Sequence, residues 1–250
     1  MKFSNFSGLS HQITTRQNGV SVGPYAARNL GLHVGDDANS VQKNRRLLAE
    51  ENGFNIKQLV CAQQVHGKNI SIISREDAGR GALDWESAIQ ASDALITDQT
   101  GIPLLILVAD CAPILLFEPN RRVFAVVHAG WRGAVAGIAG ETVELMKNHF
   151  GCDVATIQAG IGPCLCQENL EVGGEVAAII PQKSVLKPHG EKWLLDLRGL
   201  ITLDLKAAGV QNENIEVSEF CPKDRPDLFF SHRGQNGVAG RFGIVAWLND

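Results

Sequence analysis

Two chemically reactive side chains follow strongly apolar runs of this sequence. Cys111 comes shortly after Leu104–Val108, and His128 comes directly after residues 123–127. Short, continuously apolar runs rich in β-branched residues are typical of strands that are buried on both faces. A thiol and an imidazole that follow such strands lie where the chain leaves the sheet, and there the side chains can face a cleft. Because residues 118–122 have turn composition, we expect the two strands to be neighbours and the two side chains to share one site.

His66 is the third candidate, because residues 59–64 are expected to form a strand that runs into it. Two imidazoles and one thiol are a ligand set of catalytic zinc sites, which keep a fourth position for water or substrate. His66, Cys111 and His128 are therefore our candidates both for metal binding and for catalysis. The same residues also allow a chemistry without metal, with Cys111 as a nucleophile and His128 as its base. A buried structural cysteine and a surface histidine are the non-functional alternatives.

Candidate anion ligands lie beside glycine-rich segments. The guanidinium groups of Arg16 and Arg132 could grip a phosphate or a carboxylate in bidentate fashion. The helix expected after residue 133 would begin next to Gly130 and Gly133, where unpaired backbone N–H groups can hold an anion. Asp110 is a candidate general acid or base, or a support for a metal-bound histidine. The sequence therefore places possible anion ligands next to the possible metal ligands.

The remaining cysteines and arginines have less specific contexts. Cys164 and Cys166 form a C-x-C pair that lacks the spacing of structural zinc knuckles, so we interpret them as packing or supporting residues. Cys221 is interpreted as structural. Arg233 and Arg241 lie beside glycines, and the sequence leaves their roles open.

The elements that must position these residues alternate between strands and helices. Ser40 is expected to cap a helix that ends near residue 51, and Gly151 is expected to end the helix that follows residue 133. Together the elements predict one α/β domain over residues 1–250, with mixed sheets and more strands than helices. Further expected elements are strands at 69–74, 93–97, 156–161, 193–197 and 215–220, helices at 175–180 and 199–208, and a terminal hairpin that turns at 234–240.

Composition narrows the possible partners and location. The 250 residues are 44% hydrophobic and 20% charged, as in ordinary globular proteins, and the formal net charge is −4. This balance, with no run of Lys or Arg, argues against nucleic acid as a partner. Because no stretch is long enough to span a membrane and the start lacks an apolar signal region, we expect a cytoplasmic protein. The six cysteines are then expected to be reduced thiols.

Several motifs, taken in order, resemble one family. The segments QQVHG, SDALIT, ADCAP, HAGWRG, GIGPC and EVGGE are similar to those of the YfiH family, also called the laccase-domain or polyphenol oxidoreductase family. The resemblance implies a layered α/β/β/α fold similar to the catalytic domain of cytotoxic necrotizing factor, and zinc held by His66, Cys111 and His128. Two positions depart from the family pattern, which usually has a second arginine in place of Gly234 and often a glycine in place of Asn18.

The resemblance also implies a reaction. The family has been assigned phosphorolysis of adenosine, inosine and 5′-methylthioadenosine together with deamination of adenosine, whereas its older name implies copper-dependent phenol oxidation. Seven scattered histidines without an H-x-H pair are a poor source of the further copper sites that a laccase needs. Zinc, with copper as the alternative metal, suits activation of water or polarisation of a substrate oxygen. The expected partners are purine nucleosides and phosphate, with no obligate protein partner evident. A Cys-His thiol hydrolase or deamidase and a peptidoglycan-precursor editing factor are the alternatives.

Overall fold

The computed structural model describes residues 1–249, and its first sheet has four strands. Their order is β1 (Ser10–Ile13), β13 (Phe242–Trp247), β5 (Leu104–Val108) and β2 (Val60–Cys61). Strand β13 runs antiparallel to both of its neighbours, whereas β2 runs parallel to β5. The sheet therefore joins the two ends of the chain to its middle.

The second sheet has six strands and is also mixed. Its centre is the antiparallel set β6, β7 and β4, and each edge adds one parallel pair, β8 with β12 and β4 with β3. In spatial order the strands are β12 (Ile215–Val217), β8 (Gln158–Ile161), β6 (Ala112–Glu118), β7 (Val123–Ala129), β4 (Ala94–Thr97) and β3 (Ile70–Ile72).

Helix ends follow ordinary capping chemistry. The Asp37 carboxylate accepts a hydrogen bond from the backbone N–H of Ser40, so Asp37 is the N-cap and the prediction of Ser40 was three residues late. The helix expected after residue 133 begins earlier and is interrupted at Gly137, which has φ +77°. Residues 1–249 contain five α-helices: α1 (Ala38–Asn52), α2 (Trp131–Val135), α3 (Ile138–Phe150), α4 (Gly174–Ile179) and α5 (Leu197–Ala207).

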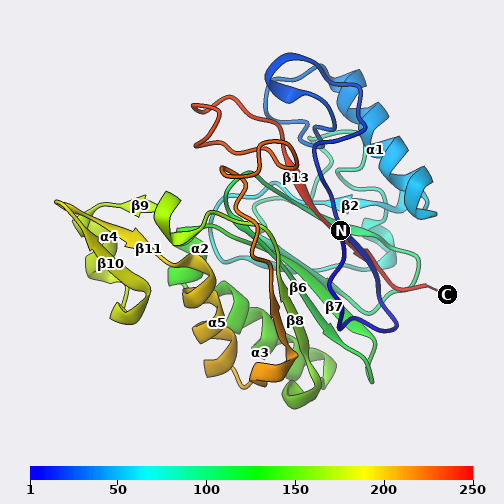
Figure 1. The fold of residues 1–250 in the computed structure, drawn as a ribbon. Coiled ribbons are helices and arrows are strands. Elements are labelled where there is room, and N and C mark those ends of the chain that lie inside the picture. Colours follow the sequence, from blue (N-terminus) through cyan, green and yellow to red (C-terminus); the bar gives the residue numbers. More distant parts are fainter. Residues whose placement is uncertain (250) are drawn as a thin grey trace.

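Alternating side chains stack the two sheets between helices. Ile106 of β5 and Phe124 of β7 belong to the apolar cluster that fills the space between the sheets. Leu105 faces the other way and packs with Leu48 of α1, whereas Val127 packs with the buried faces of α3 and α5. Figure 1 shows α1 and the pair α3 and α5 on opposite sides of the molecule. The order of layers is α/β/β/α, which confirms the predicted layered mixed fold.

A small third sheet stands out at one side of the molecule (Figure 1). It contains β10 (Leu186–His189), β11 (Lys192–Leu195) and β9 (Glu171–Val172), all antiparallel, and α4 lies next to it. Among the residues that the structure describes, no helix is both long enough and apolar enough to cross a bilayer.

Two predicted strand pairings are wrong. The strands 104–108 and 123–127 are not paired, because β6 pairs with β7 while β5 belongs to the other sheet. Asp110 and Pro113 interrupt the apolar run and obscured β6 in the sequence. The expected terminal hairpin is absent from the described residues, since β13 pairs with β1 and β5, and side-chain contacts instead fix the glycine-rich segment before it.

Candidate metal and active site

Three chain segments from different parts of the fold bring the candidate residues together. Cys111 lies where the chain crosses from β5 of one sheet to β6 of the other. His128 is near the end of β7, opposite Pro113 in the ladder, and His66 lies in the loop after β2. The Sγ atom of Cys111 and one ring nitrogen of each histidine all lie within 4.8 Å of one another. The structure therefore unites the three residues by a crossover between sheets rather than by pairing of two strands.

Backbone geometry at the crossover and in the loop is unusual. Asp110 has φ +90° and His66 has φ +59°, both in a region that non-glycine residues seldom occupy. Such conformations persist where surrounding contacts fix them, and they gather at functional sites. The two rings, of His66 and His128, are nearly perpendicular, at 86°, with their centroids 4.7 Å apart.

Asp93 is the residue that holds both histidines. Its buried carboxylate lies 2.8 Å from Nδ1 of His128 and accepts hydrogen bonds from the backbone N–H groups of His66, at 2.9 Å, and Gly67, at 2.7 Å. Because Nδ1 of His128 is engaged, Nε2 is the nitrogen left to bind a metal or to meet Cys111. A carboxylate behind a metal-binding imidazole fixes the tautomer and the orientation of the ring.

Two glycines allow the close packing of this site. A Cβ atom at Gly130 would lie 3.1 Å from Sγ of Cys111 and 3.2 Å from Cδ2 of His66. A Cβ atom at Gly133 would lie 2.8 Å from the carbonyl oxygen of Gly67. Both distances are too short for a side chain to fit without displacing its neighbours. The absence of side chains at these positions lets α2 approach the loop that carries His66.

The electrostatics of the cluster favour an ionised thiol. Burial alone would raise the pKa of Cys111, but the charge of His128 and hydrogen bonds from both histidines outweigh it and lower the pKa to about 6. Burial alone would lower the pKa of His128, but Cys111 and Asp93 raise it to about 9. The pKa of Asp93 is lowered because hydrogen bonds from His128 and the 66–67 backbone outweigh its burial. The thiolate is the form in which cysteine binds metals and attacks electrophiles.

The donor set fits a metal ion. Two imidazole nitrogens and one thiolate converge, and the other ring nitrogen of His128 already has its carboxylate partner. A metal ion held by these three ligands would keep a further coordination position for water or substrate, as in catalytic zinc sites, and two histidines with one cysteine also occur in copper sites. The cluster can therefore bind a metal ion and present it to a small molecule.

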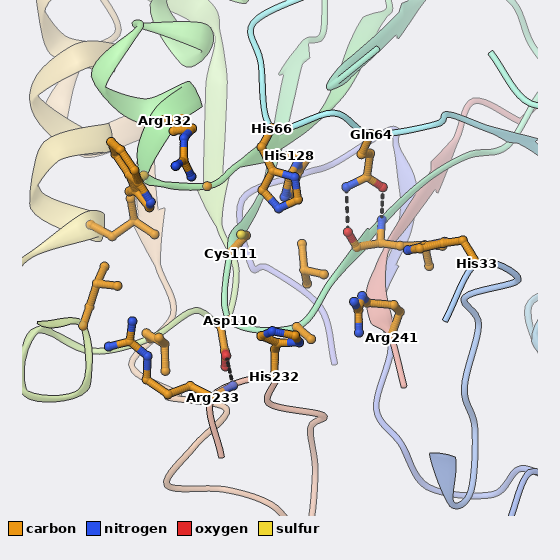
Figure 2. A pocket seen from close by; sticks show the side chains of 18 residues that line it. His33, Gln64, His66, Asp110, Cys111, His128, Arg132, His232, Arg233 and Arg241 are labelled. Carbon is orange, nitrogen blue, oxygen red and sulfur yellow. Dashed lines mark hydrogen bonds between the residues drawn. The ribbon is translucent and has the colours of Figure 1, made fainter. Parts of the chain in front are cut away.

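The cluster opens into a cavity of about 470 Å³ with a mixed wall (Figure 2). In Figure 2, Cys111 lies near the centre, with Arg132, Arg233 and Arg241 around it. A volume of this size lies within the usual range for small-molecule sites. The apolar part of the wall is formed by Leu107, Val108, Ala109, Trp131, Leu165, Leu170 and Leu197, and the polar part includes His33, Gln64, Arg132, His232, Arg233 and Arg241.

The predicted anion ligands divide into two groups. Arg132 and Gly130 line the cavity, and the Arg132 guanidinium lies 4.2 Å from the centroid of the Trp131 ring. Gly133 is a buried residue of α2 and does not line the cavity. Arg16 also lies elsewhere.

The Arg16 guanidinium is engaged by the backbone away from the cavity. It donates hydrogen bonds to the carbonyl oxygens of Ala26, at 2.7 Å, and Pro226, at 3.0 Å, and lies 4.4 Å from the centroid of the Phe230 ring. These contacts connect the N-terminal loop to the segment before β13. A glycine-rich neighbourhood indicated an exposed guanidinium, but the long-range carbonyl partners were not visible in the sequence.

Asp110 supports the cavity in a way that the sequence did not indicate. Its carboxylate accepts hydrogen bonds from Oγ of Ser231, at 2.6 Å, and from the backbone N–H of Arg233, at 2.7 Å. It thereby fixes the segment that carries His232 into the cavity wall (Figure 2). The carboxylate that orients a histidine is Asp93. The sequence signal that could have identified Asp93 is its position as a charged residue directly before the continuously buried strand β4.

Cys164, Cys166 and Gln64 occupy distinct places in the fold. Cys164 is buried, and its carbonyl oxygen accepts a hydrogen bond from Nη2 of Arg198 at 2.8 Å. Gln64 lines the cavity and both donates to and accepts from the backbone of Leu107, which fixes its amide at the edge of β5 (Figure 2). Cys166 lies outside this cavity, beside Cys221.

The layered α/β fold and the His-Cys-His cluster at the sheet crossover define a protein with a candidate metal centre. Sequence comparison identifies its family. Residues 10–249 match the family described as multi-copper polyphenol oxidoreductase laccase, and the chain belongs to this family. This agrees with the family predicted from the motifs.

Curated relatives carry two activity names. The protein named purine nucleoside phosphorylase YlmD, from Geobacillus stearothermophilus, is 40% identical over 244 residues, which are 94% of this chain and 89% of the relative. A protein named adenosine deaminase RL5, from an unknown prokaryotic organism, is 36% identical and covers 94% of this chain and 92% of its own length. The crystal structure of YlmD from G. stearothermophilus superposes with a TM-score of 0.95 at 37% identity, covering 98% of this chain and 94% of that one.

Proposed function

We propose that this chain is a zinc-dependent purine nucleoside phosphorylase that acts on adenosine, inosine and 5′-methylthioadenosine, and that it also deaminates adenosine. The observation that carries the proposal is the convergence of His66, Cys111 and His128 on a cavity with apolar and cationic walls. The activity names of the relatives support the reaction class. All six cysteines, each within residues 1–249, are free thiols, which supports a reducing, cytoplasmic location.

The three clustered residues would hold the metal. Zinc would supply Lewis-acid chemistry there, through a lowered pKa of water or polarisation of a substrate oxygen. Asp93 keeps His128 in the orientation that presents Nε2, and its hydrogen bonds to the backbone at residues 66 and 67 hold the second histidine in place. Cys111 and His128 serve as ligands in this proposal, so neither is free to act as a nucleophile or a base.

The cavity wall suits the two parts of a nucleoside reaction. Leu165, Leu170 and Leu197 offer apolar surface to the purine ring. In phosphorolysis the bond from C1′ of the ribose to N9 of the purine breaks, and a phosphate oxygen bonds to C1′. Arg132 and Gly130 line the same cavity, and in this proposal they bind that phosphate and neutralise its charge.

The test is product analysis with adenosine, in the presence and absence of phosphate. We expect adenine and ribose 1-phosphate only when phosphate is present. Inosine should form in either condition, and with phosphate part of it should be converted to hypoxanthine. Cys111→Ala should abolish both reactions, because one of three metal ligands is lost. Cys152→Ser, which changes a buried thiol outside the cavity, should leave both intact. Full activity of Cys111→Ala, or no turnover by the zinc-loaded protein, would contradict the proposal.

A thiol hydrolase is the second candidate, and one geometric feature favours it. Cys111, His128 and Asp93 follow one another as nucleophile, base and orienting carboxylate do in cysteine hydrolases. This candidate predicts activity that survives removal of metal and is lost on alkylation of Cys111. The phosphorylase proposal predicts that removal of the metal abolishes activity. Chelation followed by nucleoside and acyl-substrate assays therefore separates the two candidates.

A further inference from the structure

A second cluster of metal-ligating side chains lies outside the cavity, on two short turns. Cys166, Cys221 and Asp224 each offer one ligand atom, and the three atoms lie within 4.8 Å of one another. None of them lines the cavity that contains His66 and His128. The sequence predicted a packing or supporting role for Cys166 and a structural role for Cys221, and it did not indicate that two residues 55 positions apart meet.

We propose that Cys166, Cys221 and Asp224 form a second, structural metal site for zinc or a similar thiophilic divalent cation. Two thiolates select such ions over magnesium or calcium, which prefer oxygen ligands. With Zn–S near 2.3 Å and Zn–O near 2.0 Å, the edges of a tetrahedron between sulfur and oxygen are roughly 3.5 Å. The Sγ atom of Cys166 lies 3.5 Å from Oδ2 of Asp224, which fits this edge.

The side-chain amide of Asn169 contacts all three ligand residues. Its side-chain nitrogen, Nδ2, lies 3.2 Å from Sγ of Cys166, 3.4 Å from Sγ of Cys221 and 2.8 Å from Oδ1 of Asp224. An amide carries two N–H groups, fewer than the three acceptors gathered around it. Rotation of this amide would instead present its oxygen as a fourth ligand, and displacement of the amide would leave that position to water.

Both turns are built so that their ligands face each other. In one turn, the backbone N–H groups of Asp224 and Arg225 donate to the carbonyl oxygen of Cys221, which brings the ends of the 221–224 segment together. In the other, the N–H of Asn169 donates to the carbonyl oxygen of Cys166. The turns are also joined directly, because the N–H of Cys166 donates to Sγ of Cys221 at 3.4 Å. Ligands on paired turns are typical of structural zinc sites.

The three ligands differ in burial, and the site is open to solvent on one side, where a metal ion can enter. Cys221 is buried, with 5% of its surface exposed, Cys166 is half-buried, and Asp224 is exposed. The three residues line a surface hollow of about 670 Å³, and its other acidic side chains are Glu168, Glu216 and Glu219. These carboxylates outnumber the basic side chains of the hollow, Lys2 and Arg225, and favour the approach of a cation. The ligand set, the spacing and the access are the features by which a metal site is judged.

A metal at this position would stabilise part of the cavity wall. The segment that carries Cys166 also supplies Leu165 and Leu170 to the cavity. The carbonyl oxygen of Asn169 accepts a hydrogen bond from the Arg233 side chain at 2.9 Å. Binding at the second site would therefore fix the backbone that supports Arg233 and the apolar wall. This role does not depend on which reaction the cavity catalyses.

The test uses cobalt as a spectroscopic substitute for zinc in the full chain. Cys111→Ala removes the one thiol of the His-Cys-His cluster, so any thiolate-to-cobalt absorption in this variant must come from another cysteine. We expect one equivalent of Co²⁺ with that absorption in Cys111→Ala. Adding Cys166→Ser should abolish it, and adding Cys152→Ser, at a cysteine outside both clusters, should preserve it.

Metal content provides an independent measurement that leaves the His-Cys-His cluster intact. Purified protein loaded with zinc should hold two equivalents, and Cys166→Ser should hold one, while Cys152→Ser should still hold two. The proposal is overturned if Cys111→Ala gives no thiolate-to-cobalt absorption, or if Cys166→Ser keeps the full zinc content. Intact mass showing that Cys166 and Cys221 form a disulfide in the metal-loaded protein would overturn it as well.

Discussion

The Asp93 carboxylate lies 2.8 Å from Nδ1 of His128 and, through a second hydrogen bond, holds the backbone N–H of His66 at 2.9 Å. One buried side chain thus sets the position of two candidate metal ligands that are 62 residues apart in the chain. The other carboxylate oxygen accepts from the N–H of Gly67. Every oxygen of Asp93 is therefore committed to the geometry of the site.

Asp93→Asn should weaken metal binding without removing a ligand. The new NH₂ group would face either the N–H of Gly67 or the N–H groups near the other oxygen. In both orientations two hydrogen-bond donors point at each other, and a hydrogen bond is lost. Loss of a carboxylate behind a metal-bound histidine typically costs about 10- to 100-fold in metal affinity. Competition with a chromophoric chelator measures this change, and Asp98→Asn, at an exposed residue, is the matched control. An unchanged affinity in Asp93→Asn would show that the carboxylate does not support the metal ligands.

Gly130→Ala should damage the site through steric contact alone. Gly130 has φ −73°, which alanine adopts freely, so the backbone needs no adjustment. The added Cβ would lie 3.1 Å from Sγ of Cys111, and the thiol must move by a few tenths of an ångström. We expect a loss of nucleoside turnover on the order of 10-fold, because small displacements of catalytic groups are costly.

The control for this variant is Gly174→Ala, where a Cβ atom would meet nothing within 4 Å. Thermal unfolding of both variants should stay near that of the unchanged protein. Equal turnover by Gly130→Ala and the unchanged protein would mean that the thiol has more room than the structure gives it.

The lowered pKa of Cys111 predicts the pH dependence of its alkylation in protein treated with a chelator. Because the pKa is about 6, the rate of reaction with iodoacetamide should rise as the pH increases through 6 and level off well below pH 9, the ordinary pKa of a cysteine. Burial and the neighbouring Cys221 raise the pKa of Cys166 to about 12. Cys166 should therefore react slowly at neutral pH, although its side chain is partly exposed. Peptide mapping separates the two cysteines, and a Cys111 rate that still climbs at pH 9 would contradict the lowered pKa.

The sequence predicted the strands better than their partners. Continuous apolar runs are visible locally, and β5 and β7 lie where Leu104–Val108 and residues 123–127 placed them. Which strand pairs with which depends on contacts across the whole chain, and β6 was hidden because Asp110 and Pro113 interrupt its apolar run. The convergence of Cys111 and His128 was therefore expected for the wrong reason, since a crossover between sheets brings them together.

The site residues show the same division between local and long-range information. Cys111 and His128 were recognisable because their side-chain chemistry is unusual beside the ends of strands. His66 was expected at the end of a strand over 59–64, but β2 ends at Cys61 and His66 lies in the loop that follows. Asp93 was missed, since its role depends on a hydrogen bond to a residue 35 positions away. Arg16 was predicted as an anion ligand from its glycine-rich neighbourhood, whereas its guanidinium contacts carbonyl oxygens of Ala26 and of a segment 210 residues later, which the sequence did not indicate.

Asp110→Asn should affect substrate binding more than metal binding. Asparagine tolerates the positive φ of this position as aspartate does, so the crossover to Cys111 is retained. An amide accepts at only one end, so with its oxygen on the N–H of Arg233 its NH₂ group faces Oγ of Ser231, whose hydroxyl must then accept instead of donate. Both charge-assisted hydrogen bonds are thereby replaced by weaker neutral ones. The segment that places His232 in the cavity wall is then held less firmly.

We expect KM for adenosine to rise several-fold in Asp110→Asn, with a smaller fall in kcat and an unchanged zinc content. Ser231→Ala removes the hydroxyl partner and leaves the Arg233 N–H bonded to Asp110, so its effect on KM should be smaller but in the same direction. Steady-state kinetics together with metal analysis of both variants provides the measurement. Loss of zinc from Asp110→Asn would instead indicate that Asp110 supports Cys111 directly, because the two residues are adjacent at the crossover.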